Sequence, residues 1–197
     1  MASFLIMAVY FVLFGAVHSI LADSRPKTLA RRIFGGDADR WYRLAYIILA
    51  LIMVMPFIYI LAFLPDRILY AVRAPWKWLM VAGQVLAALG ALIALAQTNI
   101  AYFFGLDQLQ GKMGEGSLVT TGFFCHLRNP LFLFGMIFLW LFPYMTLSLL
   151  TFNVLATVYF YVGAVHEETS LLGEFGEQYR TYRQKVPMFI PRLRCRS

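Results

Sequence analysis

The chain has 197 residues, of which 61% are hydrophobic and 14% are charged, whereas soluble domains contain about 45–50% apolar and about 25% charged residues. A soluble domain of this length cannot bury so much apolar surface, so the composition excludes an ordinary globular enzyme and a disordered regulator. The net charge of +7 does not indicate a nucleic-acid-binding protein, because the basic residues lie between apolar runs rather than on one face.

Five apolar stretches follow one another along the chain, at about residues 3–22, 41–64, 76–97, 131–142 and 147–165. A helix needs roughly 20 apolar residues to cross a membrane, which four of them supply. The fourth stretch is short and Pro143 separates it from the fifth, so we expect these two to form a tight helical hairpin. The first stretch lacks a charged leading segment, which favours a retained membrane helix over a cleaved signal peptide.

These stretches predict an all-α integral membrane protein with about five transmembrane helices, the last two a short hairpin. We expect one membrane domain over residues 1–197, with a three-helix scaffold at 1–100 and a functional half at 101–197. Orientation follows from the basic residues, because cytoplasmic loops are enriched in Lys and Arg. With the N-terminus outside, fourteen of the 17 Lys and Arg residues fall on the cytoplasmic side.

Small residues recur at helical spacing in the third stretch, at Gly83, Ala87, Gly90 and Ala94. Small residues let helix backbones approach closely in a membrane. We expect a packing face here, within one chain or between two, so the oligomeric state stays open.

A further helix is expected after the fifth stretch, opened by Glu167 and Glu168 and ended by Pro187. Its apolar positions are Leu171, Leu172, Phe175, Tyr179, Tyr182 and Val186. That spacing is helical and one-sided, which is typical of an amphipathic helix on the cytoplasmic membrane surface. The glycines at 173 and 176 make a bend plausible, because glycine disfavours helix.

Ionisable residues gather at the ends of the expected helices on the cytoplasmic side, which favours a functional site there. They are His18, His126, Arg128, His166, Glu167 and Glu168. Neither a P-loop nor a G-x-G-x-x-G motif is present. The three histidines lack the spacing of a zinc site, so we expect no metal, and a haem held by His18 and His166 is the alternative. Cys125 is expected to be a small packed thiol rather than a nucleophile paired with His126.

A two-part pattern carries the strongest signal. Its first part reads Leu118-Val119, Gly122-Phe123-Phe124 and then Arg128-Asn129-Pro130-Leu131-Phe132. Its second part reads Glu167-Glu168, Leu171, Phe175-Gly176, Tyr179, Tyr182 and Val186-Pro187. Over residues 117–191 the chain resembles the integral membrane methyltransferases typified by isoprenylcysteine carboxyl methyltransferase, in which L-V-x-x-G-x-Y leads into R-H-P-x-Y and E-E precedes F-G-x-x-Y-x-x-Y. Pro143 to Thr146 and Val186-Pro187-Met188 are more similar to the bacterial methanethiol S-methyltransferase branch.

The resemblance implies that S-adenosylmethionine is the cofactor and that a small or lipid-like molecule, most plausibly a thiol, is the methyl acceptor. It implies cofactor contacts from Leu118, Val119, Gly122, Phe124, His126, Arg128, Asn129, Pro130, Phe132, Glu167 and Glu168, with Arg128, Asn129 and Glu167 in catalytic roles. Arg128 suits the cofactor's carboxylate, being planar and permanently charged. One of the two glutamates suits the ammonium or the ribose, because neighbouring residues on a helix point about 100° apart.

Three departures from the superfamily pattern bear on the function: Asn129 replaces a usual His, and Phe124 and Phe132 replace frequent tyrosines. Asparagine forms hydrogen bonds but does not titrate. Alternatives therefore stay open: methylation of a carboxylate on a prenylated cysteine, methylation of a lipid amine, or a non-enzymatic membrane sensor or assembly factor. Membrane lipids are expected partners, nucleic acid is not, and the prokaryotic inner membrane is the expected location.

Overall fold

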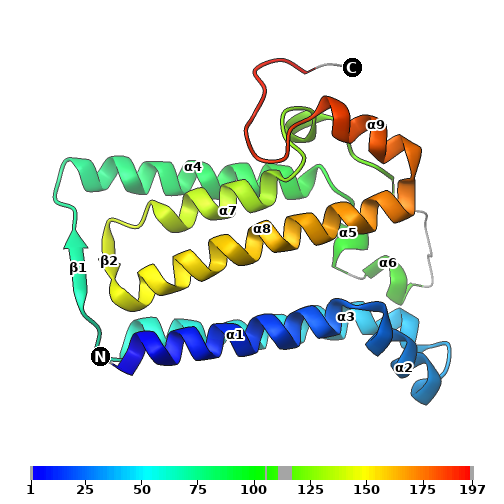
Figure 1. The fold of residues 1–197 in the computed structure, drawn as a ribbon, viewed down its shortest axis with the longest axis horizontal. Helices are drawn as coiled ribbons and strands as arrows, with labels where there is room; N and C mark the ends of the chain where they lie inside the picture. The colour runs from blue at the N-terminus through cyan, green and yellow to red at the C-terminus, as the bar shows by residue number, and fades with distance from the viewer. Residues whose placement is uncertain (1, 105, 111–116, 196–197) are drawn as a thin grey trace. The chain divides into compact units, whose positions relative to one another are not determined.

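The structure is a computed structural model that describes residues 2–104, 106–110 and 117–195. Helix dominates these residues, and strand is limited among them to two short segments, β1 (Ile68–Ala71) and β2 (Tyr144–Thr146), which pair with each other (Figure 1). The all-α membrane class predicted from the sequence is therefore confirmed. The chain divides into two compact units, described in turn, and helix α8 contributes to both.

In the described chain the first unit comprises residues 2–68, 99–104, 106–110 and 146–152. Its described helices are α1 (Ala2–Ala22), α2 (Ser24–Phe34), α3 (Ala38–Phe63), α5 (Ile100–Phe103), α6 (Leu106–Leu109) and the start of α8 (Leu147–Phe175). The Tyr10 hydroxyl on α1 donates to the Met53 carbonyl on α3 at 2.7 Å. The Phe11 ring lies between the rings of Phe57 and Phe152, at centroid distances of 5.5 and 5.6 Å. Aromatic contacts of this kind, tilted to Phe57 and edge-to-face to Phe152, stabilise the packing of α1 against α3 and the start of α8.

Asp66 fixes the start of α8. Its carboxylate accepts from the backbone N–H of Ser148 at 3.0 Å and from that of Arg67 at 2.8 Å. Burial acts to raise the pKa of Asp66, but these hydrogen bonds and one from Thr146 outweigh it and hold that pKa below its usual value. A carboxylate is favourable at this position because a helix N-terminus carries free N–H groups and partial positive charge.

The second unit comprises residues 69–98, 117–145 and 153–195 of the described chain. Its elements are most of β1 and β2, α4 (Trp76–Ala96), the 3-10 helix η1 (Gly122–Cys125), α7 (Pro130–Trp140), the remainder of α8, and α9 (Glu177–Lys185). Helices α4 and α7 lie side by side (Figure 1). A Cβ placed on Gly90 would lie 2.7 Å from the Phe134 ring, and one on Gly83 would lie 2.7 Å from Leu141. The predicted small-residue packing face is thus found within one chain.

Four helices are long and apolar enough to cross a membrane: Ala2–Ala22, Arg40–Phe63, Trp76–Ala96 and Leu147–Phe175. They match the first, second, third and fifth predicted stretches. The fourth stretch forms α7, which has 11 residues. At 1.5 Å per residue it is about 16 Å long, roughly half of a hydrocarbon core. The predicted count of five spans is therefore not confirmed, although the helical hairpin of α7 and α8 is present.

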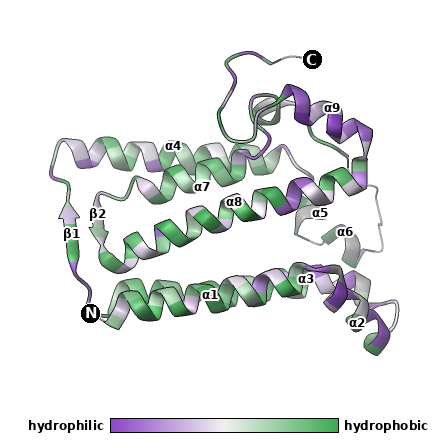
Figure 2. Ribbon diagram, viewed as in Figure 1, coloured by the Kyte–Doolittle hydropathy of each residue, from purple (hydrophilic) through white to green (hydrophobic). Residues whose placement is uncertain are grey.

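Helix α8 continues further than the sequence suggested. It runs unbroken through His166, Glu167 and Glu168 and ends at Phe175. The break comes at Gly176, whose positive φ of 53° suits glycine, and α9 follows. The two glutamates therefore lie in the last turns of a membrane helix rather than at the start of a surface helix. Apolar colouring in Figure 2 dominates the long helices, whereas α2 and α9 are largely hydrophilic.

Candidate functional site

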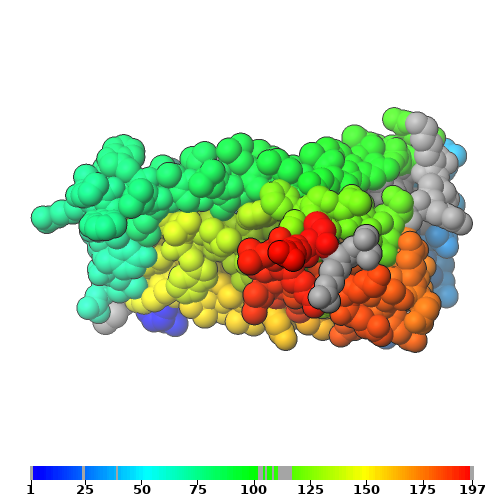
Figure 3. All heavy atoms as spheres, turned by 90° about the horizontal axis from the view of Figure 1, so that it is seen from above, coloured from blue at the N-terminus to red at the C-terminus, as the bar shows by residue number. Residues whose placement is uncertain are grey.

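The two parts of the sequence pattern meet through their main chains. The backbone N–H of Arg128 donates to the Pro187 carbonyl at 2.9 Å, and that of Asn129 donates to the Met188 carbonyl at 3.3 Å. The backbone N–H of Arg192 donates to the His126 carbonyl at 3.0 Å. The C-terminal segment 187–192 is thereby held against residues 126–129, and it is visible as the red atoms beside the green segment in Figure 3.

The Arg128 guanidinium donates most of its hydrogen bonds to groups inside the protein. Its Nε donates to Glu168 Oε1 at 2.8 Å, and its Nη1 donates to the carbonyls of Arg183 and Val186, each at 2.8 Å. These carbonyls belong to the end of α9, where a helix leaves acceptors unsatisfied. The Arg128 side chain is only 10% exposed. It therefore ties α7, α8 and α9 together at one point.

Glu168 is the buried centre of this cluster, with 7% of its side chain exposed. Besides Arg128 it accepts from Asn129 Nδ2 at 3.3 Å, and its second oxygen lies 3.5 Å from Arg183 Nε. A buried carboxylate needs such charged and hydrogen-bonding partners, because desolvation otherwise disfavours the charge. Asn129 supplies a neutral donor at this position, where it precedes the first residue of α7, the buried Pro130.

Glu167 points away from this cluster. It is exposed, and among the described residues it forms no hydrogen bond or ion pair. Of the two glutamates, Glu168 contacts Arg128 and Asn129, and Glu167 does not. Which of them contacts a cofactor stays a prediction, as do all the cofactor contacts inferred from the resemblance.

Gly122 lies where the backbone must turn with positive φ, at 62°. A Cβ there would lie 2.4 Å from the side chain of Gln97. That side chain in turn accepts from the backbone N–H of Phe123 at 2.9 Å, which secures η1 to the end of α4. Sequence reasoning missed Gln97, although a lone amide at the end of an apolar stretch was the available signal.

Two buried tyrosines of α9 pack against the residues of the site. Tyr179, Tyr182 and Val186 form an apolar core against Leu118 and Phe175. The Tyr182 hydroxyl donates to the Phe124 carbonyl at 2.6 Å. Burial, followed by the nearby Glu168 carboxylate, raises the pKa of Tyr179 to about 12. Burial, followed by Tyr179, raises the pKa of Tyr182 as well, so its hydroxyl remains a donor at neutral pH.

Aromatic rings line the first turns of α7. Phe123 packs edge-on against Phe134 with centroids 5.1 Å apart, and Phe132 packs against Phe160 at 5.6 Å. Phe132 also lies against Gly163 on α8. Val119 is half-buried. The structure thus brings most predicted site residues into one unit of the chain, around the Arg128–Glu168 pair.

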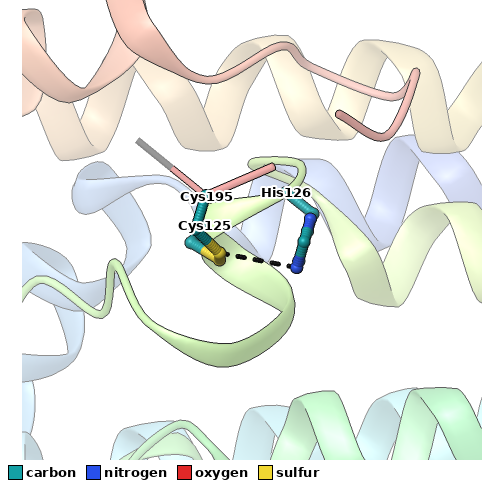
Figure 4. A group of neighbouring side chains, drawn as sticks. All are labelled: Cys125, His126 and Cys195. Carbon is teal, nitrogen blue, oxygen red and sulfur yellow. Dashed lines mark hydrogen bonds between the residues drawn. A yellow bond between two sulfur atoms is a disulfide. The ribbon is translucent and has the colours of Figure 1, made fainter. Parts of the chain in front are cut away.

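Cys125 is bonded to Cys195 as a disulfide across 70 residues of chain. The expectation that Cys125 is a small packed thiol is therefore wrong, because the pairing of residues 187–192 with 126–129 brings the following Cys195 back to Cys125. His126 lies beside the pair, with its Nε2 3.4 Å from Cys195 Sγ (Figure 4).

Long apolar helices and a buried ionic cluster define the chain as a helical integral membrane protein. No family model matches it, and no solved structure matches it. A methanethiol S-methyltransferase of a Pseudomonas strain is 30% identical, over 95% of this chain and 73% of the relative. The Mycobacterium tuberculosis enzyme of the same name is also 30% identical, over 90% of this chain and 74% of the relative.

A third relative, the methanethiol S-methyltransferase of Crocosphaera subtropica, is 34% identical over 59% of this chain. The match spans only half of that longer protein, at 50% of its length. The chain belongs to the methanethiol S-methyltransferase family, within the wider superfamily of membrane methyltransferases that its two-part pattern resembles.

Proposed function

We propose that the chain is a membrane methyltransferase that uses S-adenosylmethionine and methylates a small thiol. Its relatives are methanethiol S-methyltransferases, which supports the reaction class. The observation that carries the proposal is the buried cluster of Arg128, Asn129 and Glu168, which joins two motif halves about 40 residues apart. Ionised groups held this deeply beside a membrane helix are characteristic of functional sites.

The side chains fit the polar groups of S-adenosylmethionine. Arg128 donates from Nε to Glu168 and from Nη1 to two main-chain carbonyls. Its Nη2 donors have no partner among the described residues. Those donors suit a carboxylate, which guanidinium groups bind well. Glu167 is a carboxylate without an ion pair within the described chain, and it suits the ammonium or the ribose diol.

Glu168 acts as a positioning residue in this proposal. Its two oxygens are occupied by Arg128, Asn129 and Arg183. Removing it would release the Arg128 side chain from the orientation that presents Nη2. Glu167 would therefore contact the cofactor directly, and Glu168 would act through Arg128.

The apolar walls serve the chemistry by excluding water. S-adenosylmethionine supplies an electrophilic methyl group on a sulfonium, and transfer from it needs alignment more than acid–base catalysis. Phe124, Phe132, Leu118 and Val119 suit the apolar purine and a small acceptor. The positive charge of Arg128 favours the deprotonated form of a thiol acceptor, and the thiolate is the nucleophilic form.

The proposal includes a topology: a prokaryotic inner membrane, the N-terminus outside and the site facing the cytoplasm. The bias of Lys and Arg toward one set of loops supports it. Reporter fusions at residues 36 and 195 would both report the cytoplasmic side under this topology. A periplasmic signal at either position would contradict it.

Calorimetric titration of S-adenosylmethionine into the detergent-purified chain tests the site. Glu167→Gln and Arg128→Ala should each weaken binding by about tenfold or more, because a hydrogen bond to a charged group contributes about 1.5–3 kcal/mol and about 1.4 kcal/mol corresponds to tenfold in affinity. Glu177→Gln is the matched control, because within the described residues Glu177 pairs with the exposed Arg180 alone. Unchanged affinity in both site variants would show that the cofactor binds elsewhere.

The product separates the thiol acceptor from its rivals. Methylation of a thiol gives a thioether that survives alkali, whereas methylation of a prenylated cysteine's carboxylate gives a base-labile ester. Methylation of a lipid amine would appear in the lipid extract. No binding to the folded wild type at millimolar cofactor would instead favour a non-enzymatic membrane protein on this fold.

A further inference from the structure

Two cysteines and a histidine meet at the junction of η1 and the C-terminal segment. The ligand atoms of Cys125, His126 and Cys195 all lie within 4.8 Å of one another. Cys125 ends η1, and Cys195 follows three residues after the segment 187–192 that pairs with residues 126–129. Figure 4 shows the imidazole edge directed at the two sulfur atoms. None of these side chains takes part in the Arg128–Glu168 cluster.

The hydrogen bonds of His126 determine which ring nitrogen faces the sulfurs. Its Nδ1 lies 2.6 Å from the Arg192 carbonyl oxygen. A carbonyl only accepts, so Nδ1 carries the proton, and in the neutral ring Nε2 carries a lone pair. Metal-binding histidines are oriented in this way, with the second nitrogen donating to a backbone carbonyl or a carboxylate. The hydrogen bond from the backbone N–H of Arg192 to the His126 carbonyl keeps the two residues together and so holds the imidazole in place.

The distance between the donors suits a tetrahedral ion. Ligands at about 2.3 Å (sulfur) and about 2.0 Å (nitrogen) from zinc are roughly 3.5 Å apart at the tetrahedral angle. His126 Nε2 and Cys195 Sγ are 3.4 Å apart. Only the two sulfurs have to separate, and Cys195 is exposed in the C-terminal segment of the described chain.

We propose that Cys125, His126 and Cys195, with the cysteines reduced, bind one Zn²⁺, and that water takes the fourth position. Two thiolates and an imidazole form a ligand set that favours zinc among the common divalent ions. Two molecules of a small cytoplasmic thiol reduce the disulfide by thiol–disulfide exchange: they supply two electrons and two protons, are themselves oxidised to a disulfide, and leave two protein thiols. These two thiols release two protons to solvent when the metal binds. A cytoplasmic site favours the reduced form, because that compartment keeps thiols reduced.

The ion would fasten the C-terminal segment to residues 125–129, directly before Arg128. This inference rests on the proposed function only for the side of the membrane, and it requires no methyl transfer. Zinc binding and cofactor binding are measured separately, so either can fail without the other.

The test uses the full chain in detergent, purified through a tag without histidine, reduced with a phosphine, loaded with Zn²⁺ and desalted. Elemental analysis should give about one zinc per chain for the wild type and for the control His166→Gln, whose histidine is exposed on α8. Cys125→Ser, His126→Gln and Cys195→Ser should each lose at least tenfold to a hundredfold in affinity by chelator competition. Cys195→Ser changes an exposed residue, so loss of folding does not obscure its result.

Two further measurements can overturn the proposal. Co²⁺ in place of zinc should give a thiolate charge-transfer band and the visible bands of a tetrahedral ion, and both should be absent in Cys195→Ser. The sample with its disulfide intact should bind no more zinc than Cys195→Ser. Equal binding by reduced wild type and Cys195→Ser, or by oxidised and reduced wild type, would show that the thiolates are not ligands.

Discussion

Neutralising Glu168 should cost far more stability than neutralising a surface glutamate. In the variant Glu168→Gln, Arg128 keeps its charge at a position where its side chain is only 10% exposed. Removing one member of a buried ion pair typically costs about 3–5 kcal/mol. Glutamine still offers one oxygen to Arg128 or Asn129, and Arg183, 53% exposed, can be hydrated. We therefore expect a loss of about 2–3 kcal/mol.

Glu177→Gln provides the same chemical change without the burial. Its pair with Arg180 has side chains 74% and 61% exposed, and pairs of this kind contribute about 0.5 kcal/mol or less. The free energy of unfolding of both variants would be measured in mixed micelles by circular dichroism as the denaturing detergent is increased. Equal losses in the two variants would refute the argument that Glu168 is the centre of a buried network.

A double-mutant cycle measures the interaction free energy between Arg128 and Glu168 directly. Arg128→Gln combined with Glu168→Gln should cost less than the sum of the two single changes, because the double variant leaves no buried charge uncompensated. Additive losses would mean that each residue stabilises the fold through separate contacts.

Three further changes probe the backbone and the tyrosines by the same unfolding measurement. Gly122→Ala should cost about 2 kcal/mol or more, because it combines a positive φ with a Cβ 2.4 Å from Gln97. Gly90→Ala should cost about 1–3 kcal/mol by displacing the Phe134 ring, 2.7 Å from the new Cβ. Burial raises the pKa of Tyr179 from 10.0 to about 12. The stability linked to that shift is therefore complete below pH 10 and is lost as the pH rises toward 12. Tyr179→Phe should flatten the dependence of unfolding free energy on pH in that range.

The glycine predictions have internal controls. Gly35 has a positive φ of 77° and nothing within 4 Å of an added Cβ, so Gly35→Ala measures backbone strain alone. Gly173 lies in α8 with open space around it, and Gly173→Ala should be neutral or stabilising by up to about 1 kcal/mol. A Gly122→Ala variant no less stable than Gly35→Ala would show that Gln97 yields without cost.

Apolar length and small-residue spacing predicted the helices well, because in a membrane these features determine where a helix forms and how closely it packs. Residues 76–96 and the glycines at 83 and 90 lie as predicted. The end of α8 was misjudged because His166, Glu167 and Glu168 lower hydropathy without breaking a helix. Only Gly176, with its positive φ, interrupts the backbone.

The candidate site was predictable in part. The motif named Arg128, Asn129 and the glutamate pair, but not the acceptors that Arg128 uses. Two of these are the main-chain carbonyls of Arg183 and Val186, and a main-chain acceptor cannot be recognised from the residue type at its position. The Cys125–Cys195 pairing was missed for a related reason: it depends on the backbone pairing of residues 187–192 with 126–129, which sequence spacing does not encode.

The glycine face of α4 has a consequence for assembly. Gly83 and Gly90 receive Leu141 and Phe134 of the same chain, so the surface best suited to close helix contact is already covered. A second copy could reach it only by displacing α7, and with α7 the segment that carries Arg128 and Asn129. Self-association through that face would thus compete with the formation of the site, and any dimer of the intact protein has to be built on a different helix surface.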